Sequence, residues 1–349
     1  MTEDYGNPSS THSFGRNAKS VLELSRKSIA KRLNVVGSEI FFTSSGTEAN
    51  NWILRSAVRD LGVKRIITTK IEHHAVLYPA LALQKEFGIQ VDFVAILPDG
   101  NIDVTHLAEL LSQEVTTLVS LMHVNNEVGV VLDLERIAII CKEHNALFHS
   151  DTVQSIGKTE MDLKTLPIDF ISASAHKFHG PKGIGFAFIR KNSGLQPLLL
   201  GGEQEKGMRG GTESVYQIAG MAKALEVAYA ELDSERAYIS ELKEYCANQL
   251  AQRFPSAKIV GSNNNFYNII NVVLPLSADK TGMLLFHLDM KGIAVSRGSA
   301  CQSGSSNPSH VLAEILSPEE LMQPSLRISF SHYNTKEEID YLLEVLATV

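Results

Sequence analysis

An aspartate and a lysine follow two successive predicted strands of this sequence. Asp151 comes directly after the β-rich run Ala146 to Ser150, and Lys177 follows the run Phe170 to His176. In an open α/β sheet, ligands bind beyond the carboxyl ends of the strands, so we expect both side chains in one crevice. A lysine there can form a Schiff base, and a carboxylate can keep a pyridinium nitrogen protonated. The pair therefore predicts a pyridoxal electron sink, although an isolated Lys/Asp pair is more often structural.

A run of small polar residues earlier in the chain suits a phosphate group. The segment Thr43-Ser-Ser-Gly-Thr-Glu48 precedes a predicted helix. Its backbone amides and the Thr47 hydroxyl can cradle a phosphate at the helix N-terminus, where unpaired amides and the helix dipole favour an anion. Such runs also serve as ordinary helix caps, so this segment predicts a phosphate site only in combination with Asp151 and Lys177.

Seven short motifs together resemble those of cysteine desulfurases, which are class V relatives of the fold type I pyridoxal-phosphate aminotransferases. The similarity extends from Gly6-Asn-Pro8 to about Arg327, in the order of the family. The motifs are Ser45-Gly-Thr-Glu48, Glu72-His-His-Ala75, His123-Val-Asn-Asn-Glu-Val-Gly129, Asp151-Thr-Val-Gln-Ser155, Ser174-Ala-His-Lys177, Arg209-Gly-Gly-Thr212 and Gly298-Ser-Ala-Cys301.

The resemblance implies a pyridoxal 5′-phosphate site. Lys177 would form the internal aldimine, His73 would stack on the pyridine ring, and Asp151 would pair with the ring nitrogen. Gln154 would bond the ring hydroxyl. The phosphate would be held by the Gly46 backbone, by Thr47, Ser174 and His176, and by Thr212 of a second subunit. That last role implies a homodimer whose active sites are shared.

Arg327 and Asn126 are assigned by the same resemblance to the carboxylate of the substrate. A guanidinium fork suits a carboxylate in geometry as well as in charge. Within Ser325-Leu-Arg-Ile-Ser-Phe330, alternation with period two predicts Arg327 and Ser329 on one face and the three apolar residues on the other. An ordinary surface ion pair is the other interpretation of Arg327.

Cys301 lies in a run of small residues, Arg297 to Ser306, that predicts an exposed loop. A thiol there is reachable, whereas Cys141 and Cys246 fall in helical apolar patterns and are predicted to fill the core. The wide spacing of the three cysteines supports neither a disulfide framework nor a zinc site, so no metal is predicted. A bystander thiol is the alternative for Cys301, but an exposed thiol favours function.

The predicted reaction removes sulfur from L-cysteine and gives L-alanine with a persulfide on Cys301. Lys177, released by the substrate amine, would remove the α-proton, and His73 would act as acid or base near the sulfur. The Cys301 thiolate would attack that sulfur, and the small residues around it would let the loop move. The persulfide would then pass to an acceptor such as an iron–sulfur scaffold or a carrier for tRNA thiolation.

Two other functions fit the same residues. A selenocysteine lyase or a class V aminotransferase on this scaffold would keep the cofactor residues without requiring a thiol at Cys301. The N-terminal strand segment of the family, upstream of Gly6-Asn-Pro8, is missing from the sequence. A catalytically silent interaction subunit is therefore the alternative from another class.

Alternating helical and β-rich runs predict an α/β fold with two lobes. A large cofactor-binding domain, residues 1–230, would hold a mostly parallel sheet of the seven-stranded type covered by helices. A smaller α+β domain, residues 231–349, would carry the Cys301 loop. The predicted helices are Arg16–Leu33, Ala49–Leu61, Ala75–Phe87, Val104–Gln113, Leu134–His144, Val215–Phe254 with a break near Asp233, Thr281–Met290 and one from Lys336. The predicted strands are Arg65–Thr69, Val91–Ile96, Thr117–His123, Ala146–His149, Phe170–Ala173, Gly185–Ile189, Ile269–Leu274, Ile293–Ser296 and Leu326–Phe330.

The composition is that of an ordinary globular protein. The 349 residues are 44% hydrophobic and 20% charged, with a net charge of −7. Because no run of Lys or Arg could neutralise a phosphate backbone, nucleic acid is excluded as a partner. No stretch approaches the roughly 18 apolar residues of a membrane helix, and the polar segment Met1 to Ser13 lacks a signal-peptide apolar region. We therefore expect a cytosolic protein with no membrane partner.

Overall fold

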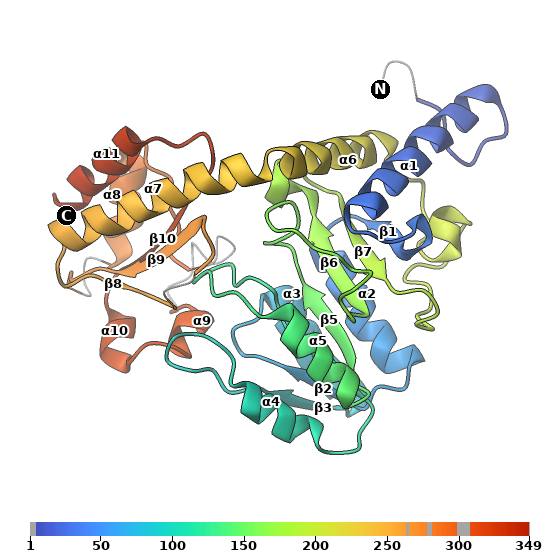
Figure 1. The fold of residues 1–349 in the computed structure, drawn as a ribbon, viewed down its shortest axis with the longest axis horizontal. Coiled ribbons are helices and arrows are strands. Elements are labelled where there is room, and N and C mark those ends of the chain that lie inside the picture. Colours follow the sequence, from blue (N-terminus) through green and yellow to red (C-terminus); the bar gives the residue numbers. More distant parts are fainter. Residues whose placement is uncertain (1–4, 263–264, 278–280, 299–307, 349) are drawn as a thin grey trace. The chain divides into compact units, whose positions relative to one another are not determined.

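The chain forms two compact units, which are shown in Figure 1. The computed structural model describes residues 5–262, 265–277, 281–298 and 308–348. The first unit comprises Met1–Phe93, Val104–His123 and Asp133–Leu232. The second comprises Val94–Asp103, Val124–Leu132 and Asp233–Val349, so two short segments that interrupt the first unit in sequence belong to the second.

The first unit is built on a seven-stranded sheet with the strand order β1-β7-β6-β5-β4-β2-β3. Neighbouring strands from β3 to β6 are parallel, whereas β7 is antiparallel to both β6 and β1. Most strands are buried along their whole length and rich in Ile, Val and Phe, as strands covered on both faces are. The strands are β1 (Ile40–Thr43), β2 (Arg65–Thr68), β3 (Gln90–Phe93), β4 (Thr117–Ser120), β5 (Leu147–Asp151), β6 (Phe170–Ser174) and β7 (Gly185–Ile189).

Helices cover both faces of this sheet. Figure 1 shows α2 and α3 behind the sheet and α5 in front of it. The core on the α2 and α3 side includes Trp52, Val76 and Leu83, packed against strand residues such as Leu118. Burying each such aliphatic side chain contributes about 1.5–3 kcal/mol. The helices are α1 (Ser13–Arg32), α2 (Gly46–Asp60), α3 (His74–Phe87), α4 (Val104–Leu111), α5 (Leu134–Glu143) and α6 (Val215–Ala230), with 3₁₀ turns η1 (Gly37–Glu39), η2 (Ala175–Phe178) and η3 (Gln204–Gly207).

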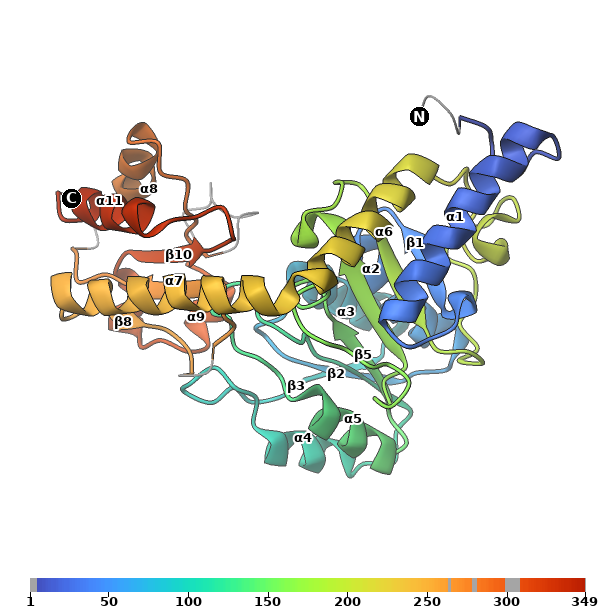
Figure 2. The same ribbon diagram turned by 45° about the horizontal axis from the view of Figure 1, so that its top comes forward.

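The second unit packs helices on a small antiparallel sheet with the order β10-β9-β8. Leu242, Cys246 and Leu250 of α7 form one core with Leu326 of β10 and Leu343 of α11. The strands are β8 (Lys258–Ile259), β9 (Ile269–Val273) and β10 (Ser325–Ser329), and the helices are α7 (Leu232–Arg253), α8 (Thr281–Met290), α9 (His310–Ala313), α10 (Pro318–Met322) and α11 (Lys336–Leu346). Figure 2 shows α7 and α11 within this unit.

The fold class predicted from the sequence is confirmed, but the predicted strands differ from the observed ones in three places. The predicted strand Ile293–Ser296 was wrong, because only Ser296 pairs with a strand residue, Arg327. Gly292 has a left-handed φ of 74°, and the Ile293 amide bonds to the end of α8, so the segment diverges from the edge of β10. The prediction also omitted two edge strands: β1, with four buried residues, and β8, with two exposed ones.

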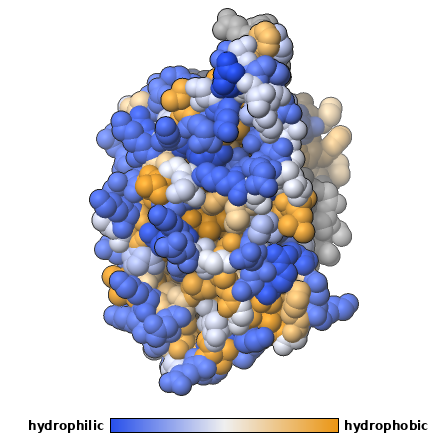
Figure 3. Space-filling model, turned by 90° about the vertical axis from the view of Figure 1, so that its right-hand side faces the viewer, coloured by the Kyte–Doolittle hydropathy of each residue, from blue (hydrophilic) through white to orange (hydrophobic). Residues whose placement is uncertain are grey.

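The surface is mixed in character. Figure 3 shows hydrophobic residues gathered in the centre and lower half of one face, among hydrophilic ones. None of the helices in the described residues combines the length and the apolar character needed to cross a membrane.

Candidate active site

Five chain segments meet at one edge of the large sheet. The strands β2, β4, β5 and β6 are parallel, so their carboxyl ends lie along the same edge. The strand β1 points the same way as β6, because both pair antiparallel with β7. Asp151 ends β5, and the segments that follow β1, β2 and β6 carry Gly46, His73 and Lys177. The topology therefore brings four of the predicted cofactor residues to a single edge, where ligands bind in open α/β sheets.

Asp151 is the last residue of β5 and is buried. Its Oδ2 accepts a hydrogen bond of 2.7 Å from Nδ2 of Asn50, and its Oδ1 accepts one of 3.0 Å from the amide of Val153. Both donors hold the carboxylate in position.

Burial shifts the pKa values of three titratable groups around Asp151 in favour of their neutral forms. Burial raises the pKa of Glu72 well above its ordinary value, and the nearby charge of Asp151 adds to the shift. Burial also lowers the pKa of His149 to about 3 and that of His123 to about 4. The two histidines therefore carry no positive charge at neutral pH, and the shift of Glu72 favours its neutral form.

The start of α2 forms an anion cradle. Ser45 caps the helix by accepting from the amide of Glu48 at 3.2 Å, and the Gly46 amide donates to Oγ of Ser174 at 2.8 Å. A Cβ at Gly46 would lie only 2.4 Å from Cγ2 of Val153, so glycine is required here. Thr47, the second residue of the helix, is exposed. The Gly46 and Glu48 amides are already bonded to Ser174 and Ser45, so an anion at this positive end of the helix dipole would meet the exposed Thr47 and the Ser174 hydroxyl.

Lys177 lies in η2, the single turn that follows β6, and is half-buried. His176 beside it is exposed. Partial burial lowers the pKa of His176, and the charges of Lys177, Lys182 and Lys158 lower it further. A neutral His176 can donate to a phosphate oxygen without adding charge.

His73 is half-buried and caps α3, because its Nδ1 accepts from the amide of Ala75 at 3.1 Å. This bond places the proton of a neutral ring on Nε2. Gln154, three residues after Asp151, is half-buried as well. The bond from the Ala75 amide, at the start of α3, thus fixes the tautomer of the His73 ring.

The segment that carries Thr212 is tied to the start of α2. Nε of Arg209 donates to Oε1 of Glu48 at 2.9 Å. Although burial raises the pKa of Glu48, its bonds from Arg209 and Ser44 outweigh burial and lower the pKa. Thr212 itself is exposed, so it is available to another molecule.

In the second unit, the structure brings Arg327 and Asn126 together. Nη1 of Arg327 donates to the backbone oxygen of Asn126 at 2.9 Å. Leu326, Ile328 and Phe330 are buried in the core of this unit, while Arg327 is half-buried. The predicted alternation along β10 is confirmed.

Cys301 lies outside the described residues. Two described residues on either side of its segment, Gly298 and Ser309, lie near one carboxylate. Oγ of Ser309 donates to Oε2 of Glu127 at 2.5 Å, and a Cβ at Gly298 would lie 3.1 Å from the same oxygen. The other two cysteines are buried, as predicted, and burial raises the pKa of both Cys141 and Cys246 to about 12.

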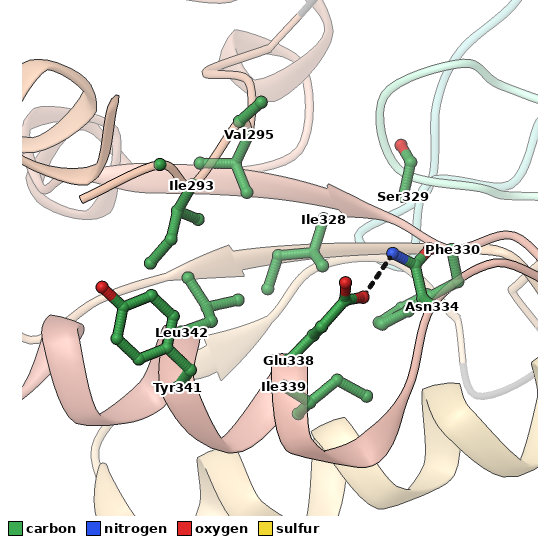
Figure 4. A pocket seen from close by; sticks show the side chains of 12 residues that line it. Ile293, Val295, Ile328, Ser329, Phe330, Asn334, Glu338, Ile339, Tyr341 and Leu342 are labelled. Atoms are coloured by element: carbon green, nitrogen blue, oxygen red, sulfur yellow. Dashed lines mark hydrogen bonds between the residues drawn. The ribbon is translucent and has the colours of Figure 1, made fainter. Parts of the chain in front are cut away.

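A pocket of about 370 Å³ lies elsewhere in the second unit, between the segment 292–295, β10 and α11. Figure 4 shows its apolar walls, among them Ile293, Ile328 and Leu342, and the hydrogen bond of 3.0 Å from Asn334 to Glu338 at one end. None of the residues predicted to bind the cofactor or the substrate lines it. This pocket is therefore distinct from the predicted site.

Two residues near Asp151 carry no role in the sequence-based prediction. Asn50 lies one turn after Gly46 on α2, so helical spacing could have placed it on the same face. Glu72 precedes His73, but its pKa depends on burial that no local pattern reports.

Comparison with known proteins gives one consistent result. The aminotransferase class-V family matches residues 1–342. The cysteine desulfurase IscS of Dictyoglomus turgidum is 40% identical over 352 residues, which span 100% of this chain and 88% of that protein. A solved NifS-like protein superposes with a TM-score of 0.90 at 38% identity, covering 99% of this chain and 92% of that one. The structure described as SspA in complex with cysteine has a TM-score of 0.81 at 31% identity, covering 96% of this chain and 93% of that one.

Proposed function

Because the chain belongs to the aminotransferase class-V family and, within it, to the cysteine desulfurases, we propose that it is a pyridoxal-phosphate enzyme that converts L-cysteine to L-alanine and retains the sulfur. The observation that carries the proposal is the buried Asp151 at the same sheet edge as Lys177 and the α2 cradle.

The residues present fit pyridoxal 5′-phosphate. The glycine-dependent cradle at Gly46, with Thr47, Ser174 and His176, suits its phosphate. Asp151 suits the protonated ring nitrogen, His73 suits the ring face and Gln154 suits the ring hydroxyl. When bound, this cofactor supplies an electron sink that stabilises negative charge on the α-carbon of the substrate.

The proton transfers fall to two side chains of the first unit. The amine of Lys177, which anchors the cofactor before substrate enters, takes the proton from the α-carbon once it is released. His73 holds a proton on Nε2, because its Nδ1 accepts from the Ala75 amide. It can therefore protonate or orient the departing group.

Arg327 and Asn126 bind and orient the substrate carboxylate. The guanidinium keeps its position through the bond of Nη1 to the Asn126 backbone and through a longer bond of 3.4 Å from Nη2 to Oγ of Ser296. Asn126 contributes its side-chain amide, since its backbone oxygen is already occupied by the arginine. Both residues belong to the second unit.

Cys301 accepts the sulfur. Its thiolate attacks the sulfur of the substrate, a sulfur–sulfur bond forms, and the bond between that sulfur and the β-carbon breaks. Cysteine and one enzyme thiol thus become alanine and one enzyme persulfide, with no external oxidant. The buried thiols of Cys141 and Cys246, with pKa values of about 12, are poor nucleophiles at neutral pH.

We also propose that the enzyme is a homodimer in which Thr212 reaches the phosphate of the other subunit. Exposed apolar residues flank the Thr212 segment: Leu200 is 90% exposed, and Leu199, 44% exposed, bridges to Arg209. Covering these side chains in a second subunit would be favourable. Light scattering should give twice the chain mass, and Leu200→Glu should reduce it.

The acceptor of the persulfide sulfur is proposed to be a protein, either an iron–sulfur scaffold or a carrier for tRNA thiolation. A cytosolic location remains the expectation from the sequence. Neither proposal affects the chemistry at the site.

One experiment tests the main proposal. The protein is incubated with L-cysteine without any keto acid, alanine is quantified, and the persulfide is located by mass spectrometry. We expect alanine in the wild type, a 32-dalton adduct on the peptide of Cys301, about the mass of one sulfur atom, and neither in Cys301→Ser. Lys177→Ala should lose the yellow absorbance of the bound cofactor. Full sulfide release by Cys301→Ser would refute the persulfide role, and alanine formed only with a keto acid would indicate an aminotransferase.

A further inference from the structure

The side chain of Asn50, on helix α2, bonds the carboxylate of Asp151 at the end of strand β5. It is fully buried on α2, and its Nδ2 donates to Oδ2 of Asp151 at 2.7 Å. Its own Oδ1 has no hydrogen-bond partner among the residues that the structure describes. The reverse orientation of the amide would put an oxygen against a carboxylate, so only the donating orientation is chemically reasonable. The fold thus leaves one polar atom of Asn50 unsatisfied in order to make this bond.

The two donors to Asp151 fix its plane. The Asn50 amide bonds one oxygen and the Val153 amide bonds the other, at 2.7 and 3.0 Å. The Val153 bond is made by the backbone, whereas the Asn50 bond is made by a side chain. Each oxygen keeps a lone pair for a further donor, such as a protonated ring nitrogen.

Burial increases the weight of the Asn50 bond, because Asn50 is 0% and Asp151 5% exposed. Burial also lowers the pKa of His123 to about 4 and that of His149 to about 3, so neither histidine offers a positive charge to the carboxylate at neutral pH. A hydrogen bond to a carboxylate in such surroundings is stronger than the same bond in water. The orientation of Asp151 therefore depends on Asn50.

We propose that Asn50 is a positioning residue that keeps the carboxylate of Asp151 aimed at the ring nitrogen of the bound cofactor. The inference rests on the proposed function and adds a residue that acts only through Asp151. Loss of the Asn50 amide should weaken the binding of pyridoxal 5′-phosphate and shift the visible absorbance of the bound form.

The first test measures cofactor affinity rather than activity. Protein stripped of cofactor is titrated with pyridoxal 5′-phosphate, and the dissociation constant is taken from the visible absorbance. Asn50→Leu, which has nearly the same shape and no donor, should raise that constant about 10- to 100-fold, the effect of losing one hydrogen bond to a charged group. Asn51→Leu is the matched control, since Asn51 bonds only the Thr47 backbone oxygen one turn earlier, at 3.0 Å. It should stay within about twofold.

A double-mutant cycle separates positioning from a structural role. If Asn50 acts through Asp151, then Asn50→Leu should have no further effect on the dissociation constant in an Asp151→Asn background. Multiplicative losses in the double variant, or unchanged affinity and absorbance in Asn50→Leu, would overturn the inference. If melting curves show that Asn50→Leu does not fold, Asn50→Ser replaces it in the same cycle.

The outcome is distinguishable from failure of the proposed function. A wild-type protein that binds no pyridoxal 5′-phosphate would refute the enzyme itself. A wild type whose absorbance depends on Lys177, combined with an Asn50→Leu variant that binds equally well, would refute the role of Asn50 alone.

Discussion

Replacing Arg26 by Met should destabilise the first unit more than any surface substitution. Both Arg26 and Glu205 are only 2% exposed. The guanidinium donates to the two carboxylate oxygens of Glu205 at 2.7 and 2.8 Å, and Nη1 also donates to the backbone oxygen of Ile40 at 2.7 Å. Removing the arginine leaves a buried carboxylate whose remaining donor is the Phe42 amide at 2.9 Å.

The expected loss follows from the burial of the pair. Breaking a buried ion pair by removing one partner costs about 3–5 kcal/mol, because the other charge stays desolvated. The pair also fastens η3, where Glu205 and Lys206 have left-handed φ values of 48° and 60° that disfavour non-glycine residues. Loss of the Arg26–Glu205 ion pair should therefore make η3, the turn that precedes Arg209, less ordered.

The measurement is urea denaturation followed by tryptophan fluorescence. The single tryptophan, Trp52, is fully buried in the first unit and reports on that unit alone. Arg26→Met should lower the free energy of unfolding by about 3–5 kcal/mol, and Glu205→Gln should lose less in the Arg26→Met background than in the wild type.

Arg55→Met provides the matched control for a lost ion pair. Arg55 pairs with Glu86 at 3.1 Å, but the two side chains are 44% and 52% exposed, so its loss should cost less than about 1 kcal/mol. A loss in Arg26→Met as small as in Arg55→Met would show that water reaches the guanidinium and would refute the reasoning.

Three further outcomes are expected. Gly46→Ala should weaken pyridoxal 5′-phosphate binding at least about tenfold in the absorbance titration. Its Cβ would lie 2.4 Å from Val153, and overpacking typically costs about 1–3 kcal/mol. Unchanged binding would show that the segment around Gly46 can move to accommodate a Cβ. Iodoacetamide at neutral pH should modify neither Cys141 nor Cys246 in the native protein, since burial raises both pKa values to about 12, and peptide mass spectrometry would reveal any exception. Glu72→Gln should gain stability relative to the wild type as pH rises, because the folded-state pKa of Glu72 is raised above its ordinary 4.5. The wild type therefore loses stability from about pH 4.5 upward until that raised pKa is passed. Melting temperatures of the two proteins that run parallel across pH would contradict the shift.

The sheet edge could be predicted because its signals are local. Asp151 and Lys177 each follow a short buried strand, and a strand-end position is visible in a few neighbouring residues. The edge strand β1 was missed, because its four residues Ile40–Thr43 run straight into the polar segment that starts α2. A strand this short gives too few positions for a pattern to emerge.

No local sequence pattern predicted the contacts between segments that are distant in the chain. The alternation along β10 predicted the face of Arg327, but its bond to Asn126 joins residues 201 positions apart, and only the family resemblance paired them. Likewise, nothing in the segments Val94–Asp103 and Val124–Leu132 indicates that they belong to the second unit. Such pairings depend on the tertiary fold rather than on periodicity.

The protonation states of the site residues are the property that the sequence predicts least well. Glu72, His123, His149 and Asp151 are four titratable residues in the printed chain, and their ordinary pKa values would make both acids anionic and both histidines partly cationic at neutral pH. Burial raises the pKa of Glu72 and lowers those of His123 and His149 to about 4 and about 3, so each shift favours the neutral form. A buried carboxylate such as that of Asp151 needs hydrogen-bond donors, and the Asn50 amide, which lies 101 positions earlier in the chain, supplies one. Both the burial and this donor depend on the tertiary fold, so no local pattern in the sequence could predict them.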